Sequence, residues 1–336
     1  MRRLALITTT ALLLISPSWS SVARSTTPPL PSDGHGIHVD GATWMPGIDD
    51  RLLDVTVSSA ALTRPAGVRV LVPASYRDHP DRRYPVLYLL HGGFGGYRDW
   101  TEAGDAQRLT AGLDLIVVMP DGGQGGWYAD WYNDGRGGPP AWERFHIGQV
   151  VPWVDANFRT IGDRSGRAIA GLSMGGFGAM SYAARHPDLF ASASSFSGAV
   201  DLNQPAVRVL VWISPLIDGG TPGAIFGHLL FDDANVRAHN PWDRAANVAG
   251  MHVALYTGNG LPGPLDPPGT LIDPQEPFVH QMNVALHERL TSLGIAHTWR
   301  DYGAGTHRWP YWVRSLGEEL PAIMAVLALA RDSAGG

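Results

Sequence analysis

The sequence predicts an α/β fold in which a mostly parallel central sheet carries helices on both faces. Two observations lead to this prediction. Short apolar runs alternate with helical patterns along most of the chain, and several of the runs are nearly continuous in Val, Ile and Leu. A strand that is covered on both faces has no polar side, so such runs are typical of parallel sheets. Alternation of strand and helix, without an internal repeat, places the strands in one sheet between two helical layers.

The predicted elements follow from local pattern. Helices are expected over 142–158, 174–185, 277–290 and 312–329. Within the third helix, Phe278, Met282, Leu286 and Leu290 recur at every fourth position and form a stripe that faces the core. Residues 201–250 are irregular to helical, and we expect them to be a small cap-like insertion. The predicted strands are the runs at 67–72, 84–90, 113–119, 167–171, 191–197, 252–257 and 296–302.

The N-terminal segment carries the pattern of a secretory signal peptide. Arg2 and Arg3 precede a mostly apolar run over 4–15, and small residues end at Ala23. This apolar run is too short to cross about 30 Å of hydrocarbon as a helix. We therefore predict a signal peptide over 1–23, no membrane span, and a protein that is secreted or held in the cell envelope.

The rest of the chain is predicted as one domain with a leader. Residues 24–50 are rich in Ser, Thr, Pro and Gly and show little periodicity, which predicts a loose N-terminal leader. Residues 51–331 are predicted as a single domain. A net charge of −6 argues against binding to nucleic acid or to anionic membranes. The absence of cysteine excludes disulfides, thiolate metal sites and a cysteine nucleophile, and we expect neither a metal nor a cofactor.

A nucleophile motif lies between a predicted strand and a predicted helix. Residues 171–175 read Gly-Leu-Ser-Met-Gly, a G-x-S-x-G pattern in which Ser173 follows the strand directly. In an α/β-hydrolase fold a sharp turn at this place exposes the serine hydroxyl for attack on an ester. The motif predicts that fold with Ser173 as the nucleophile.

The oxyanion donors and the base are expected at two other strand ends. His91, Gly92 and Gly93 follow an apolar strand and are similar to the H-G-G loop of esterases, so Gly93 and Met174 N–H groups are the expected oxyanion donors. In hydrolases of this fold the histidine comes last in chain order. His307 follows the last predicted strand and is therefore the predicted base.

The acid that orients this histidine should lie between the nucleophile and the base. Three carboxylates follow the strand at 252–257, namely Asp266, Asp273 and Glu276. Their position alone does not choose between them.

The motifs together resemble one family. From Arg51 to Leu329 the chain is similar to the secreted mycolyltransferases, or fibronectin-binding antigens, within the esterase D-like α/β-hydrolases. The segments that carry the resemblance are 87–90 (Leu-Tyr-Leu-Leu), 117–120 (Val-Val-Met-Pro), 122–124 (Gly-Gly-Gln), 130–132 (Asp-Trp-Tyr), 171–174 (Gly-Leu-Ser-Met), 258–260 (Gly-Asn-Gly), 305–309 (Gly-Thr-His-Arg-Trp) and 311–312 (Tyr-Trp).

The resemblance implies further assignments. It implies Glu276 as the acid, because the family places a glutamate in a Glu-x-Phe-Val sequence after Gly-Asn-Gly, and it supports Gly93 as the first oxyanion donor. His91 stands where the family has an aspartate that helps to hold a trehalose acceptor, and Thr257 replaces a cysteine. We predict His91 and Trp309 as substrate-binding residues and expect weak transfer to trehalose, because a neutral imidazole has a single acceptor nitrogen.

Two functions are compatible with these features. The leading hypothesis is an exported serine esterase or acyltransferase that forms an acyl-enzyme on Ser173. It would act on an acyl ester or glycolipid and transfer the acyl group to water or to a sugar or lipid hydroxyl. The alternative is a cell-envelope protein that binds carbohydrate or a matrix protein. In that case Trp127, Tyr128, Trp131 and Tyr132 would form an exposed aromatic platform.

Overall fold

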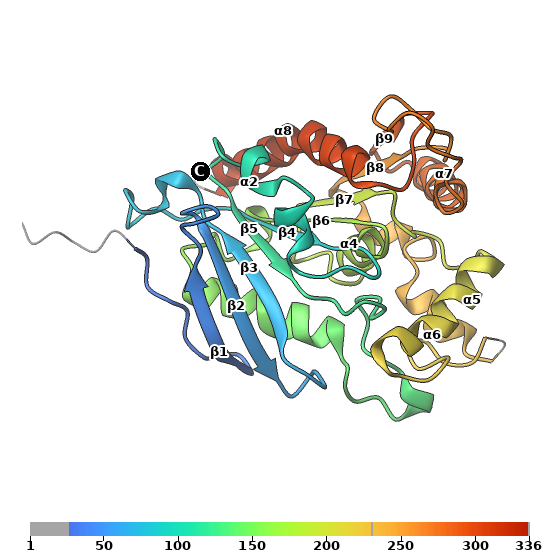
Figure 1. Ribbon diagram of the computed structural model, residues 1–336, viewed down its shortest axis with the longest axis horizontal. Helices are drawn as coiled ribbons and strands as arrows, with labels where there is room; N and C mark the ends of the chain where they lie inside the picture. The colour runs from blue at the N-terminus through green and yellow to red at the C-terminus, as the bar shows by residue number, and fades with distance from the viewer. Residues whose placement is uncertain (1–26, 230, 335–336) are drawn as a thin grey trace, which may run out of the picture.

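The computed structural model describes residues 27–229 and 231–334, and a nine-stranded sheet forms its centre (Figure 1). The strands lie in the order β1-β2-β3-β5-β4-β6-β7-β8-β9. Their bounds are β1 (Ile37–Trp44), β2 (Leu52–Ser59), β3 (Ala66–Leu71), β4 (Val86–Leu90), β5 (Ile116–Pro120), β6 (Arg167–Leu172), β7 (Ser192–Phe196), β8 (His252–Thr257) and β9 (Thr298–Asp301).

Most of the sheet is parallel. From β5 through β4, β6, β7 and β8 to β9, each strand runs parallel to its neighbour. The strands β1, β2 and β3 form an antiparallel edge that joins the rest where β3 pairs with β5. The α/β-hydrolase fold predicted from the motifs is confirmed. Parallel pairing brings the carboxyl ends of β4, β6, β7, β8 and β9 to one edge, where loops can combine side chains from distant parts of the chain.

Helices cover both faces of the sheet, and Figure 1 shows α8 along one side with α4 on the other. Side chains of β4 alternate between the two layers: Leu87 and Leu89 pack with α8, while Tyr88 and Leu90 pack with α4. The helix bounds are α1 (Asp99–Glu102), α2 (Ala106–Leu109), α3 (Val151–Asn157) after a π-helical turn η3 (Arg144–Val150), α4 (Met174–Arg185), α5 (Pro205–Ile213), α6 (Asp233–His239), α7 (Glu276–Ser292) and α8 (Trp309–Ala334).

The N-terminal leader differs from the expectation. Part of the segment 24–50, expected to be loose, forms β1, and Ser32 is held by hydrogen bonds from Trp153 Nε1 and to Asn157 Oδ1, each 2.8 Å long. In β1 only Ile37 is fully buried, because the strand lies at the sheet edge. Its sequence therefore lacked the apolar signal of a covered strand. The predicted signal peptide lies outside the described residues.

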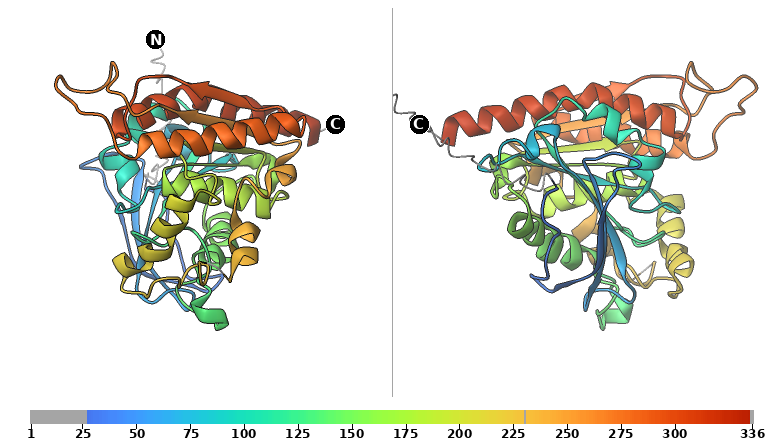
Figure 2. Two further views of the ribbon diagram at one scale, coloured as in Figure 1. Left: turned by 90° about the vertical axis from the view of Figure 1, so that its right-hand side faces the viewer. Right: turned by 60° about the vertical axis from the view of Figure 1, so that its left-hand side comes forward.

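The segment 201–250 connects β7 to β8 and contains α5 and α6. Figure 2 shows these helices, in yellow, on the side of the sheet away from α8. Within 27–229 and 231–334, no helix combines the length and the apolar character needed to cross a membrane.

Candidate active site

Ser173 occupies a strained turn between β6 and α4. Its backbone has φ 52° and ψ −119°, a conformation that non-glycine residues rarely adopt. In this turn the serine side chain projects away from both the preceding strand and the following helix. The turn requires glycine at its flanks. A Cβ on Gly171 would lie 2.3 Å from the carbonyl oxygen of Gly175, and a Cβ on Gly175 would lie 2.5 Å from the carbonyl oxygens of Leu90 and His91.

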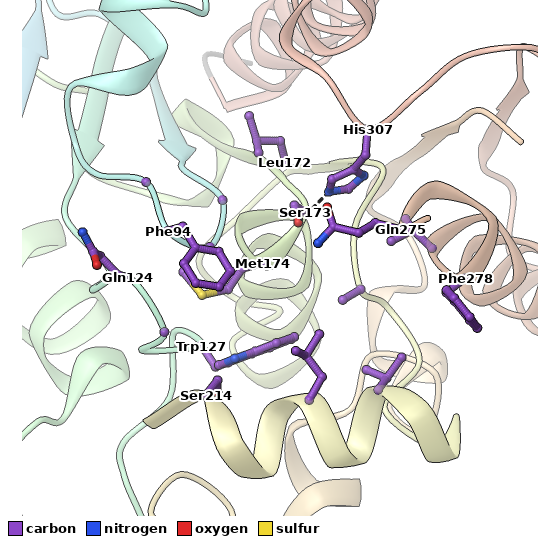
Figure 3. A pocket seen from close by; sticks show the side chains of 18 of the residues that line it. Phe94, Gln124, Trp127, Leu172, Ser173, Met174, Ser214, Gln275, Phe278 and His307 are labelled. Atoms are coloured by element: carbon purple, nitrogen blue, oxygen red, sulfur yellow. Dashed lines mark hydrogen bonds between the residues drawn. The ribbon is translucent and has the colours of Figure 1, made fainter. Parts of the chain in front are cut away.

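The structure brings Ser173, His307 and Glu276 into one chain of hydrogen bonds. Nε2 of His307 lies 2.9 Å from Oγ of Ser173, and Nδ1 of His307 lies 2.6 Å from Oε2 of Glu276. Figure 3 shows the imidazole of His307, from the loop after β9, directed at Ser173. Residues from three distant parts of the sequence thus form a nucleophile–base–acid arrangement.

Glu276 is the fully buried first residue of α7, and its carboxylate is surrounded by donors. The hydroxyls of Ser197 and Thr257 lie 2.7 Å and 3.1 Å from Oε1. Gly258 N–H donates to the same oxygen at 2.8 Å. A buried carboxylate needs such partners, and here they leave Oε2 for His307.

Asp266 and Asp273, the other two candidates, do not contact the imidazole nitrogens. Asp273 accepts hydrogen bonds from the backbone N–H groups of Gln275, Glu276 and His307. Burial acts to raise the pKa of Asp273, but these donors hold it below its ordinary value. Asp266 accepts from the Thr306 and Tyr311 hydroxyls. Both aspartates therefore tie the loops that carry the acid and the base.

Ser197, Thr257 and Gly258 around Glu276 were not among the predicted site residues. Ser197 directly follows β7 with φ 47°, and this backbone conformation is visible only in the structure. Thr257 stood out in the sequence only as a departure from the family cysteine.

The two predicted oxyanion donors lie at the same strand edge. Gly93 follows β4, and Met174 begins α4, where the first N–H groups of a helix have no partner within the helix. Among the described residues, neither the Gly93 N–H nor the Met174 N–H donates to a protein acceptor. Both residues line the pocket that contains Ser173. Two free backbone donors beside the nucleophile are the requirement for an oxyanion hole.

A pocket of about 870 Å³ opens above Ser173, and its lining is mostly apolar. Trp309, predicted to bind substrate, is among the lining residues. Phe94, Trp127 and Met174 also line the pocket, and Figure 3 shows α5, in yellow, along the bottom of the view. Further lining comes from α5 and α7 (Ala206, Val207, Leu210, Phe278, Val279 and Met282). The volume is in the range of small-molecule sites.

His91 does not line the pocket, although it was predicted as a substrate-binding residue. Its side chain is 1% exposed and does not line the pocket. Nδ1 lies 2.8 Å from the carbonyl oxygen of Gly92, and Nε2 lies 2.8 Å from the N–H of Gly122. Both ring nitrogens are thus used by the backbone, because the side chain turns under the loop instead of toward the pocket.

The aromatic cluster after β5 is not an exposed platform. Trp127, Tyr128 and Trp131 are buried, Tyr132 is half-buried, and Tyr128 donates through its hydroxyl to the carbonyl oxygen of His91. These rings pack beneath the glycine-rich loop, and Trp127 alone among the three reaches the pocket. The feature that favoured a binding protein is therefore part of the core.

Comparisons with known proteins agree with the predicted resemblance. Residues 59–323 match the family model described as putative esterase. An esterase of Mycobacterium tuberculosis is 39% identical over 279 residues, which cover 79% of this chain and 57% of that protein. The chain thus spans little more than half the length of that relative.

An acyltransferase is similar over almost its whole length. The diacylglycerol acyltransferase/mycolyltransferase Ag85B of Mycobacterium leprae is 30% identical over 318 residues, covering 88% of this chain and 94% of the relative. Among solved structures, Mycobacterium tuberculosis MPT51 superposes with a TM-score of 0.66 at 24% identity, covering 81% of this chain and 97% of that one. An S-formylglutathione hydrolase from Agrobacterium tumefaciens gives a TM-score of 0.63 at 19% identity, covering 86% and 99%. These two likenesses support the fold. The chain belongs to the putative esterase family and is homologous to the Ag85 mycolyltransferases.

Proposed function

We propose that this protein is a serine esterase or acyltransferase that works through an acyl-enzyme on Ser173. The observation that carries the proposal is the hydrogen-bonded chain from Ser173 through His307 to Glu276 at the floor of an apolar pocket. A serine hydroxyl is a weak nucleophile at neutral pH, and an adjacent base with a fixed orientation activates it. Membership of an esterase family supports the same chemistry.

The proposed reaction follows from the positions of the groups. Oγ of Ser173 forms a bond to the acyl carbon while Nε2 of His307 takes the hydroxyl proton. The carbonyl oxygen becomes an oxyanion, which the N–H groups of Gly93 and Met174 stabilise. The ester C–O bond then breaks, and the leaving alcohol takes the proton from His307. Glu276 keeps the imidazole in the tautomer that has its proton on Nδ1 and stabilises the imidazolium.

Labelling with a fluorophosphonate tests the proposal directly. The reagent needs an activated serine, so the wild-type protein should gain one phosphonyl adduct, located on Ser173 by peptide mass spectrometry. Ser173→Ala should remain unlabelled while keeping the same unfolding temperature. Ser181→Ala removes a buried hydroxyl of α4 that does not line the pocket, so it serves as the matched control and should label like the wild type. Labelling at another residue, or none in the wild type, would contradict the mechanism.

We propose that the acyl part of the substrate is apolar and that water is the principal acceptor. The apolar walls from α5 and α7 favour a hydrocarbon acyl group over a polar one. At about 55 M water, an acceptor at about 1 mM needs a rate advantage of about 5 × 10⁴, or about 6 kcal/mol of positioning. His91 offers no group to an acceptor, because both ring nitrogens are bound to the backbone.

A product assay measures this partition. An acyl ester is incubated with about 1 mM trehalose, and free acid and acyl-trehalose are quantified by mass spectrometry. We expect mostly free acid. Mostly acyl-trehalose would show that other residues hold the sugar, and the transferase function would then be preferred.

We also propose that the protein is exported, on the basis of the N-terminal sequence pattern. N-terminal sequencing of the protein from the culture medium and from the cell envelope should give a mature chain that begins near Arg24. A chain that retains residues 4–15 would indicate an anchor instead.

A further inference from the structure

A line of hydrogen bonds leads from the core of the molecule to the loop that carries Gly93. The Tyr182 hydroxyl lies 2.9 Å from Nδ1 of His146, and Nε2 of His146 lies 2.8 Å from the carbonyl oxygen of Asp121. The next peptide N–H, that of Gly122, donates at 2.8 Å to Nε2 of His91. None of these groups lines the pocket, neither the side chains of Tyr182, His146 and His91 nor the Asp121–Gly122 peptide group.

The direction of each bond is fixed by its partners. A carbonyl oxygen only accepts, so Nε2 of His146 and Nδ1 of His91 must both carry protons. The Gly122 N–H only donates, so Nε2 of His91 must be unprotonated. The proton of His91 in this arrangement is on Nδ1, whereas that of His146 is on Nε2. Burial lowers the pKa of His146 to about 4, in keeping with its neutral form.

The last link orients a peptide group. Nδ1–H of His91 donates to the carbonyl oxygen of Gly92 at 2.8 Å. The peptide bond between Gly92 and Gly93 is trans, so its C=O and N–H point in opposite directions. Because His91 holds the carbonyl on the buried side, the Gly93 N–H points to the pocket side. Rotation of this peptide would remove the donor from the oxyanion hole.

The Gly92–Gly93 peptide group needs a hydrogen-bond partner to fix its orientation, because both residues are glycine. Residues 92 and 93 are both glycine, which has the widest backbone freedom, and the Gly93 N–H has no protein acceptor within the described chain that could fix its direction. Among residues 27–229 and 231–334, the Gly92 carbonyl accepts, besides the bond from His91, only a long 3.4 Å bond from Gly95 N–H. The shorter bond from His91 is therefore the stronger of the two constraints.

We propose that His91 is a positioning residue, the end of a buried relay that runs from Tyr182 through His146 and Asp121 and aims the Gly93 N–H at the oxyanion. All the bonds of the relay donate in the same direction, toward Gly93, so each polarises the next. This inference rests on the proposed acyl-enzyme function. It gives His91 a role in stabilising the transition state of acylation, through the Gly93 N–H, and no role in binding an acceptor.

A pair of variants at His91 isolates the contact with Gly92. Leucine fills the space of the imidazole but neither donates nor accepts, whereas the amide of asparagine can donate from near the position of Nδ1. Both variants lose the acceptor for Gly122 N–H, so this loss cancels in their comparison. We expect His91→Leu to lower kcat/KM for a p-nitrophenyl ester about 10- to 100-fold, since loss of a whole oxyanion donor costs about 10²–10³. His91→Asn should recover most of that loss.

Inhibitor affinity separates positioning from a general structural effect. An apolar trifluoromethyl ketone forms a hemiketal oxyanion on the serine, whereas the corresponding alcohol does not. The ketone should bind His91→Leu more weakly by the same factor as the loss in kcat/KM, and binding of the alcohol should not change. Active sites are counted by fluorophosphonate titration, so misfolded protein does not enter the comparison. His239→Leu, which removes a buried histidine that does not line the pocket, is the matched control and should leave ketone affinity unchanged.

The outcomes distinguish this inference from the proposed function. Equal kcat/KM and equal ketone affinity in wild type and His91→Leu would overturn the relay and leave the acyl-enzyme intact. A second result would also overturn it: an unchanged rate of acylation, measured as the p-nitrophenol burst, together with a changed ratio of acyl-trehalose to free acid. That result would show that His91 acts in binding the acceptor. Failure of Ser173 to react with the fluorophosphonate would instead refute the acyl-enzyme itself.

Discussion

The exchange of Glu276 for glutamine keeps the size of the side chain and replaces one carboxylate oxygen by an NH2 group. In the protein, Oε1 receives the Ser197 and Thr257 hydroxyls. It also receives the Gly258 N–H, which can only donate. The amide oxygen of a glutamine must therefore remain on this side, and its NH2 group must face Nδ1 of His307.

That orientation inverts the imidazole tautomer. Nδ1 of His307 has to accept, so the ring proton moves to Nε2, which lies 2.9 Å from Oγ of Ser173. A protonated Nε2 cannot take the hydroxyl proton. The equivalent change in a Ser-His-Asp triad lowers kcat by about 10⁴. We expect a loss of this order for Glu276→Gln, which corresponds to about 5.4 kcal/mol of activation free energy.

Stopped-flow release of p-nitrophenol measures the acylation step, and thermal unfolding verifies that the variant is folded. Asp273→Asn is the matched control. It makes the same chemical change in a carboxylate that bonds to the backbone N–H groups of Glu276 and His307 but to no ring nitrogen. We expect it to lose about tenfold in kcat, because misplacement of catalytic groups is costly but the tautomer is kept. A Glu276→Gln variant within tenfold of wild type, or an Asp273→Asn variant that is the more impaired, would refute this reasoning.

Three further predictions follow from the site. Ser173→Ala should lower kcat by about 10⁶ without loss of stability, and steady-state hydrolysis within tenfold of wild type would exclude the mechanism. Gly175→Ala places a Cβ 2.5 Å from two backbone carbonyls and should destabilise the fold by more than about 2 kcal/mol in urea unfolding, whereas Gly112→Ala, with nothing within 4 Å, should not. The pKa of Asp273 lies below its ordinary value of 3.8, so its ionised form stabilises the fold above that pH and this contribution disappears as the pH falls through the lowered pKa. The stability difference between wild type and Asp273→Asn should accordingly shrink from pH 6 to pH 3, and a difference that grows on acidification would contradict the argument.

Local pattern was most informative where a strand is covered on both faces or a helix has one apolar stripe. The helix at 174–185 and the strand at 252–257 have the predicted bounds, and the helix over Glu276–Ser292 exceeds its prediction by only a few residues. β1 and β2 were not predicted as strands. In β1 the reason is physical, since an edge strand with a single fully buried residue has a sequence close to that of a loop.

The order of the motifs along the chain was enough to propose the nucleophile and the base. Ser173 between a strand and a helix, and His307 after the last strand, follow from chain order in this fold, and the structure brings the two into contact. The acid could not be chosen by position, because three carboxylates follow the same strand. Only the resemblance singled out Glu276, whose contact with His307 the structure then shows.

The α/β-hydrolase fold, the nucleophile and the base could be predicted from the sequence, because each depends on a local pattern or on chain order. The family and Glu276 followed from the resemblance. The direction in which His91 points is visible only in the folded chain. A histidine at a strand end can turn toward a ligand or under its own loop, and the choice depends on partners that are remote in sequence. Here the remote partner is Gly122, whose N–H donates to Nε2 of His91 and holds the buried imidazole beneath the loop that carries Gly93.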